Sequence, residues 1–239
     1  MGPDLCLPSI KARNNDSTQL PNGYATSNGQ LADSLSKTDG LRIGYHAGLN
    51  VLFKFSDQFY MDVGLGYRNS GFRRHLYKLQ QEDSMMYVGE IEELSQGVPK
   101  NITYHFRYSY LEVPLLFHYS LQNIEHRFDD VNYYITFGIS TSLLMQTNYN
   151  ARLFGFSVDE KIFFKGTDNQ YKFATTGVNA MLGARIVSVM DEKWKFYFTP
   201  LFTYPLLSGT ANNEGINWKT SLVQLNFGFN YMFADKSND

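Results

Sequence analysis

Hydrophobic and polar positions alternate with a period of two over most of this chain. From residue 41 to residue 55 the odd positions carry Leu, Ile, Tyr, Ala, Leu, Val, Phe and Phe, and the even positions are mostly small or polar. Successive side chains of a β-strand point to opposite faces, so this pattern predicts a strand with one apolar face and one polar face. We find no segment of useful length with the helical period. The sequence therefore predicts an all-β protein.

Seven strands of this kind are expected from residue 41 onward. They cover about residues 41–55, 59–68, 102–119, 132–145, 172–187, 194–207 and 220–233. In the third strand the apolar residues change from even to odd positions close to Pro114. Proline cannot donate a hydrogen bond to a strand ladder, so we expect a bulge at Pro114. The last strand closes with the aromatic residues Tyr231 and Phe233.

The connections between these strands alternate in length. Three are short (56–58, 121–130 and 189–193), and three are long, polar and charged (74–100, 147–170 and 208–217). Short turns at one end and long loops at the other are typical of outer-membrane barrels. The pattern favours a transmembrane up-and-down antiparallel β-barrel whose apolar face contacts lipid.

The number of strands raises a question about the start of the chain. Closed bacterial barrels have an even number of strands, so an eighth strand should precede residue 40. The local candidate, residues 5–10, is short and contains Pro8. We therefore divide the chain into a polar N-terminal segment at 1–39, in a loop or disordered, a barrel at 40–233 and a tail at 234–239. We also expect a signal peptide and most of the first strand to lie upstream of Met1.

Composition narrows the classes of function. The chain is 43% hydrophobic and 18% charged, with a net charge of −2, which argues against a nucleic-acid partner. The single cysteine, Cys6, excludes a disulfide within the chain. The longest uncharged run, 131–151, is interrupted by polar residues, so no transmembrane helix is expected.

Three segments carry a family resemblance. They are Tyr-Leu-Glu-Val-Pro-Leu-Leu at 110–116, Gly-Tyr-His-Ala-Gly-Leu at 44–49 and the aromatic strand at 225–233. The first resembles a proline-containing stretch of the outer-membrane β-barrel family of Bacteroidota, and the other two resemble its Gly-rich second strand and its closing strand. That family includes porin-like proteins and a barrel associated with type IX secretion. The resemblance implies the fold and a location in the bacterial outer membrane, but no particular biochemical role, because such barrels differ chiefly in their loops.

The polar face is expected to fill the interior, because eight strands leave just enough room for side chains. Buried charges must be paired, so Arg42, Arg68 and Arg185 are predicted to pair with Asp62 or Glu112. A polar conduit or a substrate contact is the alternative interpretation. The full set of candidate interior residues is Arg42, His46, Lys54, Asp62, Arg68, His105, Arg107, Glu112, Arg185, Gln224, Asn226 and Asn230.

The sequence gives little support for a catalytic site or a metal site. The candidates His46, His105 and His118 lack the spacing of metal ligands, and Ser109 lies about 13 Å from His105 along one strand face. The acidic residues between 82 and 93 predict a solvated loop rather than a Ca²⁺ site. We expect no catalytic residue, no metal and no cofactor.

These features favour a non-enzymatic outer-membrane barrel that serves as a scaffold or as an accessory subunit of a larger complex in secretion, assembly or envelope integrity. It would contact outer-membrane lipid and lipopolysaccharide through its wall, and protein partners through the loops at 74–100 and 147–170 or the wall. One alternative is a narrow porin-like channel for small solutes. Another is a soluble lipocalin-like carrier, in which the apolar side chains would face inward.

Overall fold

The computed structural model describes most of the chain as β-strands. The described residues are 1–12, 17–19, 25–27, 39–77, 101–121, 131–153, 156–163, 172–173, 175–191, 193–207, 210–212 and 216–231. Within these ranges, no helix is long and apolar enough to cross a membrane.

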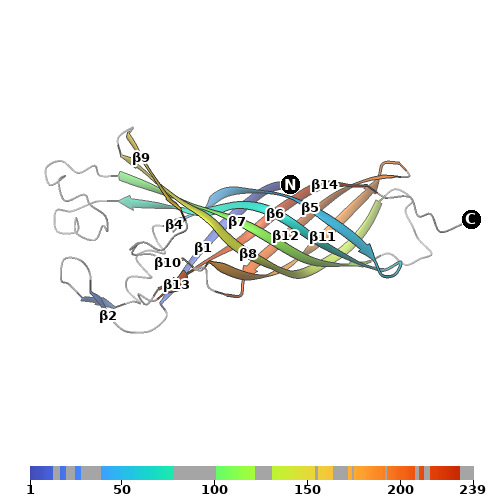
Figure 1. The fold of residues 1–239 in the computed structure, drawn as a ribbon, viewed down its shortest axis with the longest axis horizontal. Coiled ribbons are helices and arrows are strands. Elements are labelled where there is room, and N and C mark those ends of the chain that lie inside the picture. Colours follow the sequence, from blue (N-terminus) through green and yellow to red (C-terminus); the bar gives the residue numbers. More distant parts are fainter. Residues whose placement is uncertain are drawn as a thin grey trace, which may run out of the picture.

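Eight long strands close into an antiparallel barrel (Figure 1). Each strand pairs with its neighbours in the order β1, β5, β6, β7, β8, β11, β12 and β14, and β14 pairs with β1 again. The strands are β1 (Gly2–Ala12), β5 (Arg42–Lys54), β6 (Phe59–Tyr77), β7 (Asn101–Ser120), β8 (Val131–Leu153), β11 (Thr176–Val189), β12 (Trp194–Pro205) and β14 (Ile216–Tyr231).

Six short strands lie outside this cycle. β4 pairs with β6 and β9 pairs with β8, while β2 pairs with β3 and β10 with β13. Their bounds are β2 (Ser17–Gln19), β3 (Ala25–Ser27), β4 (Asp39–Gly40), β9 (Phe156–Phe163), β10 (Lys172–Phe173) and β13 (Thr210–Asn212).

The all-β barrel is confirmed, and the eighth strand is supplied from within the chain. β1 runs from Gly2 to Ala12, pairing with β14 over Asp4–Ala12 and with β5 over Gly2–Cys6. The sequence analysis limited this strand within the chain to a remnant at 5–10 and began the barrel at residue 40. Both bounds are wrong, because the paired strand covers Gly2–Ala12 and includes Pro8.

Pro8 fits in β1 because of the side to which its nitrogen points. Met1 donates to Phe227 O over 2.8 Å, and Phe227 N donates to Met1 O over 2.9 Å. Since successive backbone groups of a strand alternate in direction, the nitrogens of even-numbered residues face β5. The last pair between β1 and β5 is Cys6 with Arg42, so the missing N–H of Pro8 removes no bond from that ladder.

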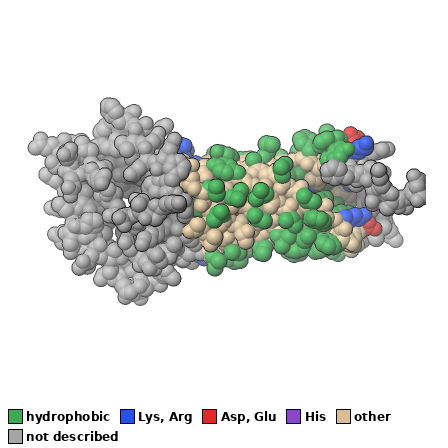
Figure 2. Space-filling view, in the orientation of Figure 1, with side chains coloured by type: hydrophobic (Ala, Val, Ile, Leu, Met, Phe, Trp, Pro, Cys, Tyr) green, Lys and Arg blue, Asp and Glu red, His purple; other side chains and the backbone are tan. Residues whose placement is uncertain are grey.

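The apolar face of the barrel points outward. Large hydrophobic side chains cover the wall in Figure 2, and Leu49 is 85% exposed. Most interior positions of the same strands are buried and polar, such as Asp62, Glu112 and Arg185. This is the arrangement of a barrel that faces lipid, and it is opposite to the one that a soluble carrier requires.

The bulge expected at Pro114 is not there. Pro114 lies opposite Ser140 in an unbroken stretch of the β7–β8 ladder, and the register shifts earlier, between Ser109 and Tyr110. The side of β7 that faces the barrel interior is also the same before and after Pro114. Tyr108 and Tyr110 lie at even-numbered positions of β7, as the inward-facing Glu112 does, and they pack with Phe72 and Leu144. The apparent change of phase therefore marks a change from aromatic to polar filling inside the barrel.

One end of the barrel continues as a sheet. β8 pairs with β11 as far as Leu143 and with β9 from Gln146 to Leu153. β6, β7, β8 and β9 consequently extend beyond the wall (Figure 1). Residues 147–153 and 156–163 are strands in this extension, so the prediction of one long loop at 147–170 is wrong there.

Candidate functional site

A buried ion pair spans the barrel interior. Arg185 Nη1 on β11 donates to Asp62 Oδ2 on β6 over 2.5 Å. The ring of His118 on β7 lies beside the pair, with its Nε2 3.1 Å from Asp62 Oδ2 and 2.9 Å from Arg185 Nη1. Its Nδ1 forms a 2.8 Å hydrogen bond with Thr136 Oγ1 on β8. Four strands are thus joined through side chains that all face inward.

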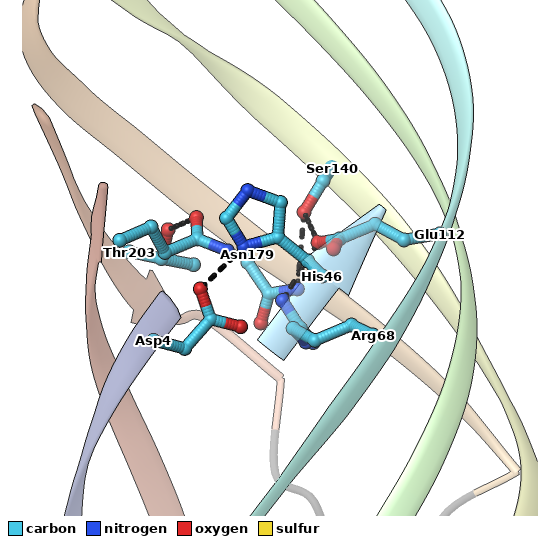
Figure 3. A network of polar contacts seen from close by, with 8 residues as sticks. Asp4, His46, Arg68, Glu112, Ser140, Asn179 and Thr203 are labelled. Atoms are coloured by element: carbon cyan, nitrogen blue, oxygen red, sulfur yellow. Dashed lines mark hydrogen bonds and ion pairs between the residues drawn. The ribbon is translucent and has the colours of Figure 1, made fainter. Parts of the chain in front are cut away.

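A second buried network lies around Glu112 (Figure 3). Arg68 Nη1 donates to Glu112 Oε1 over 2.8 Å, and Ser140 Oγ donates to the same oxygen over 2.5 Å. Asn179 Nδ2 donates to Ser140 Oγ over 3.1 Å. The charged pair is therefore hydrogen-bonded within the barrel rather than left facing an open lumen.

Two further contacts complete the polar filling on the side of β1, β5, β12 and β14. His46 Nδ1 lies 2.5 Å from Asp4 Oδ1, and Asp4 is fully buried. Thr203 Oγ1 donates to Gln224 Oε1 over 2.7 Å. Figure 3 shows both contacts within the same interior as Arg68 and Glu112.

A small cavity lies between these layers. Its volume is about 80 Å³, and its lining includes His46, Asp62, Glu112, Arg185 and Asn226. The buried Leu116, Met181 and Leu201 pack together nearby, while the cluster of Phe72, Tyr108 and Leu144 fills the barrel toward the sheet extension. Such a cavity can hold a few water molecules, and it is far smaller than the 300–1,000 Å³ typical of ligand pockets.

The comparisons with known proteins agree with this geometry. The model of the family described as "Outer membrane protein beta-barrel domain" matches residues 17–233. The chain belongs to this family. It is an outer-membrane β-barrel. Comparison with curated proteins gives no match.

Comparison with solved structures gives matches at low identity. Neisserial surface protein A is 7% identical, with a TM-score of 0.36, over 96% of this chain and 94% of that one. Ail, the attachment invasion locus protein of Yersinia pestis, solved with the heparin analogue sucrose octasulfate, is 12% identical with a TM-score of 0.29, over 96% and 94% of the two chains. A second structure of Ail is 11% identical with a TM-score of 0.26, over 96% and 97%.

The structure places most of the predicted interior residues of the outer-membrane barrel inside it. Arg68 pairs with Glu112 and Arg185 with Asp62, which are two of the pairings that the sequence predicted. Arg185 Nη2 also donates to Asn230 Oδ1 over 3.4 Å. The other residues found in the interior are His46, Gln224 and Asn226.

Besides His105, three of the predicted residues have other surroundings. Lys54 is 59% exposed at the turn between β5 and β6, where it forms a 2.7 Å ion pair with Asp57. Arg107 occupies an odd position of β7 and is exposed on the outer wall. Arg42 forms its hydrogen bonds with Asn69 and with two carbonyl oxygens, rather than with a carboxylate in the interior.

Several other residues that the sequence analysis singled out make contacts that support the fold. Tyr231 packs against Trp194 on the outer wall, with ring centroids 5.0 Å apart. Ser109 Oγ lies 2.8 Å from the Tyr67 hydroxyl and accepts from Asn69 Nδ2 over 3.2 Å, so its contacts are those of a structural hydroxyl. His105 lies on β7 at an odd-numbered position like the exposed Arg107, so its expected place in the interior is wrong. Phe233 and the acidic residues between 82 and 93 lie outside the described residues.

Sequence reasoning missed the short polar residues of the interior. Asp4, Thr136, Ser140 and Asn179 are all buried, and each hydrogen-bonds to one of the predicted networks or to His46. Strand parity could have identified the last three, because they occupy the same inward positions as the charged residues. Among the described residues, no group of three or more His, Cys, Asp or Glu side chains could hold a metal ion, and Cys6 is buried with a free thiol.

Proposed function

We propose that this outer-membrane barrel is a non-enzymatic scaffold that docks a partner protein of an outer-membrane complex on the sheet extension formed by β6, β7, β8 and β9. The observation that carries the proposal is the change of partner along β8, which leaves β11 after Leu143 and continues with β9. A barrel that served as a membrane plug alone would need no strands beyond the membrane.

The backbone of β9 supports this role. Among the described strands, β9 pairs with β8 alone, so its other edge offers backbone donors and acceptors to a further strand. An exposed sheet edge is a common docking site for an extended peptide, because the main-chain hydrogen bonds supply affinity. Long loops, and hence the sheet extension to which they belong, lie on the extracellular side in barrels of this kind.

The filled interior argues against the porin-like alternative. The Arg185–Asp62 pair crosses the interior from β11 to β6, and the Arg68–Glu112 pair joins the neighbouring strands β6 and β7. The cavity of about 80 Å³ that Asp62, Glu112 and Arg185 help to line has no room for a solute of ordinary size. Planar-bilayer recording of the purified protein should therefore show no stable ion conductance. Steady conductance steps would favour the channel.

The resemblance to barrels of Bacteroidota suggests where to look for the partner. A secretion or assembly complex of that group, including type IX secretion, is the first candidate, and outer-membrane lipid and lipopolysaccharide would surround the wall. Fractionation of the natively expressed protein tests the location. Recovery outside the outer-membrane fraction would contradict the scaffold proposal and would favour a soluble carrier.

A shortened hairpin tests the docking site. Tyr149 pairs with Glu160, so replacing residues 150–159 with Asn-Gly should close a tight hairpin without changing the barrel. We expect gentle-detergent purification of the unaltered chain to recover a stoichiometric partner, identified by mass spectrometry, and the shortened chain to lose it. A control with Lys54→Gln and Asp57→Asn at the opposite end should keep it. Retention by the shortened chain, or purification of the unaltered chain alone, would contradict the proposal.

A further inference from the structure

Two arginines are neighbours on the outer wall, at the end of the barrel where the sheet extension begins. Arg73 on β6 and Arg107 on β7 are both exposed. Both lie at odd-numbered positions, like the outward-facing Tyr67 on β6 and Val113 on β7. Arg107 lies opposite Gly71, two residues from Arg73, so the two arginines are diagonal neighbours in one antiparallel pair. Side chains in such positions start about 7–8 Å apart and can reach the same ligand atom.

A third arginine joins them because of an irregularity before β5. Gly40 lies opposite Arg73, whereas Tyr45 lies opposite Asn69, so five steps along one strand match four along the other. The backbone of Arg42 still lies opposite the buried Cys6, but its guanidinium reaches Asn69, which lies at an odd-numbered position of β6 like the outward-facing Tyr67. There Arg42 Nη2 donates to Asn69 Oδ1 over 2.8 Å.

Further hydrogen bonds confirm the position of Arg42. Its Nη1 donates to Ser70 O over 2.7 Å and to Phe106 O over 2.8 Å. Asn69 continues the chain through Ser109 to the hydroxyl of Tyr67, which is 40% exposed on the outer wall. The Arg42 guanidinium is thus held in place by fixed acceptors.

The three positive charges lack counter-charges among the described residues. All the hydrogen-bond acceptors of Arg42 are neutral. Arg73 and Arg107 form no hydrogen bond or ion pair with any described residue. Three cations gathered on one face form a site that an anion would stabilise.

The height of this cluster matches that of lipid headgroups. On β6, the outward residues run from Phe59 through Tyr67 to Arg73. At about 3.4 Å per residue and a tilt of about 40°, Tyr67 lies roughly 21 Å and Arg73 roughly 36 Å from Phe59 along the barrel axis. The apolar band of such barrels is about 25 Å tall, so a band that begins at Phe59 ends between Tyr67 and Arg73, and Arg73 lies roughly 11 Å beyond it. Figure 2 shows Lys and Arg side chains at this edge of the apolar wall.

We propose that Arg42, Arg73 and Arg107 bind a phosphate group of a phosphorylated glycolipid in the outer leaflet. Arginine suits this ligand, because its planar guanidinium donates two parallel hydrogen bonds to phosphate oxygens. Tyr45 and Tyr67 face the lipid directly below the cluster, where they contact the acyl chains and the sugar of the same molecule. The site rests on the outer-membrane placement in the proposed function, but it does not depend on the partner protein.

Native mass spectrometry of the full chain in detergent micelles tests the site with a defined probe, lipid A carrying both phosphates. We expect the unaltered protein to retain this lipid and to retain dephosphorylated lipid A far less. Arg73→Gln with Arg107→Gln should weaken binding about 30-fold, since each cation near an anionic lipid contributes about fivefold. Arg73→Lys with Arg107→Lys keeps both charges and should weaken binding less.

A matched control removes the same charge at the other end of the barrel. Lys54→Gln with Lys193→Gln should leave lipid A binding unchanged, and the heat-dependent gel shift of a folded barrel reports whether each variant folds. Equal binding of dephosphorylated lipid A, or equal loss in the control, would overturn the site. Equal retention of a phosphatidylglycerol probe would overturn the assignment to a glycolipid. None of these outcomes bears on partner recovery, so the two proposals fail separately.

Discussion

Arg185 and Asp62 form a 2.5 Å ion pair across the barrel interior, although they are 123 residues apart in the chain. Both side chains are almost completely buried, at 4% and 6% exposed. Burial of a charge is costly unless it is paired, so the pair ties β11 to β6 and fixes how the wall closes. The same pair fills the part of the lumen through which a solute would have to pass.

Breaking that pair should destabilise the barrel more than a surface ion pair would. Asp62→Asn leaves the Arg185 charge without its carboxylate, and removal of one partner of a buried pair costs about 3 to 5 kcal/mol. Urea unfolding in micelles, followed by the heat-dependent gel shift, measures this loss. Lys54→Gln breaks the exposed pair with Asp57 and should cost less than about 1 kcal/mol. Equal losses for the two variants would contradict the structural role of the interior pair.

The orientation of the apolar face can be tested at Leu49, which is 85% exposed on the wall. In a lipid-facing position, Leu49→Arg should lower the free energy of unfolding from bilayers by about 2 to 4 kcal/mol, because arginine is poorly solvated by hydrocarbon. Ser56→Arg in the turn after β5 should have no comparable effect. A neutral result at Leu49 would show that this wall faces water.

Cys6 reports on the closure of the barrel by β1. Its side chain is fully buried, and it pairs with Arg42 on one side and Leu222 on the other. A water-soluble maleimide should therefore label Cys6 orders of magnitude more slowly in the folded barrel than after unfolding, because labelling requires local opening. Ser56→Cys adds an accessible thiol to the same molecule and should react at once. Fast labelling of Cys6 would show that β1 is not seated in the wall.

Gly71 should not tolerate a side chain. Its φ is 151°, and a Cβ at this position would overlap Phe106 O and lie 2.5 Å from Arg42 Nη1. Gly71→Ala should therefore displace the Arg42 guanidinium and cost about 1 to 3 kcal/mol in stability. If the arginine site exists, lipid A binding should fall in the same variant. Gly66→Ala, where the nearest atom is 3.2 Å away, is the milder control.

Much of the wall could be predicted because strand parity depends on local sequence. The alternation through β5 and β14 identified the outward Leu49 and the inward Asn226 without knowledge of any neighbour. At Arg42, parity identified the backbone position opposite Cys6 but not the acceptors to which the long side chain turns, the carbonyl oxygens of Ser70 and Phe106.

The length of the first strand was underestimated for a related reason. Asp4 and Pro8 weaken the apolar signal of a short segment, yet Asp4 has a partner in His46 and the Pro8 nitrogen faces away from β14. Both compensations come from strands distant in sequence. Local propensity is a weak guide where tertiary contacts supply what the segment lacks.

The sequence by itself determined a barrel of antiparallel strands with sorted connections, since a period of two and the lengths of connections are local properties. It favoured an outer-membrane barrel over a soluble carrier, but the structure decided that the apolar face points outward. The sequence also determined that charged residues such as Arg68 and Glu112 belong to the interior. Which charge meets which, how much lumen remains and where the arginines gather were decided by the tertiary structure alone. The physical reason is that these relationships depend on the register between strands, and register is set only when the barrel closes.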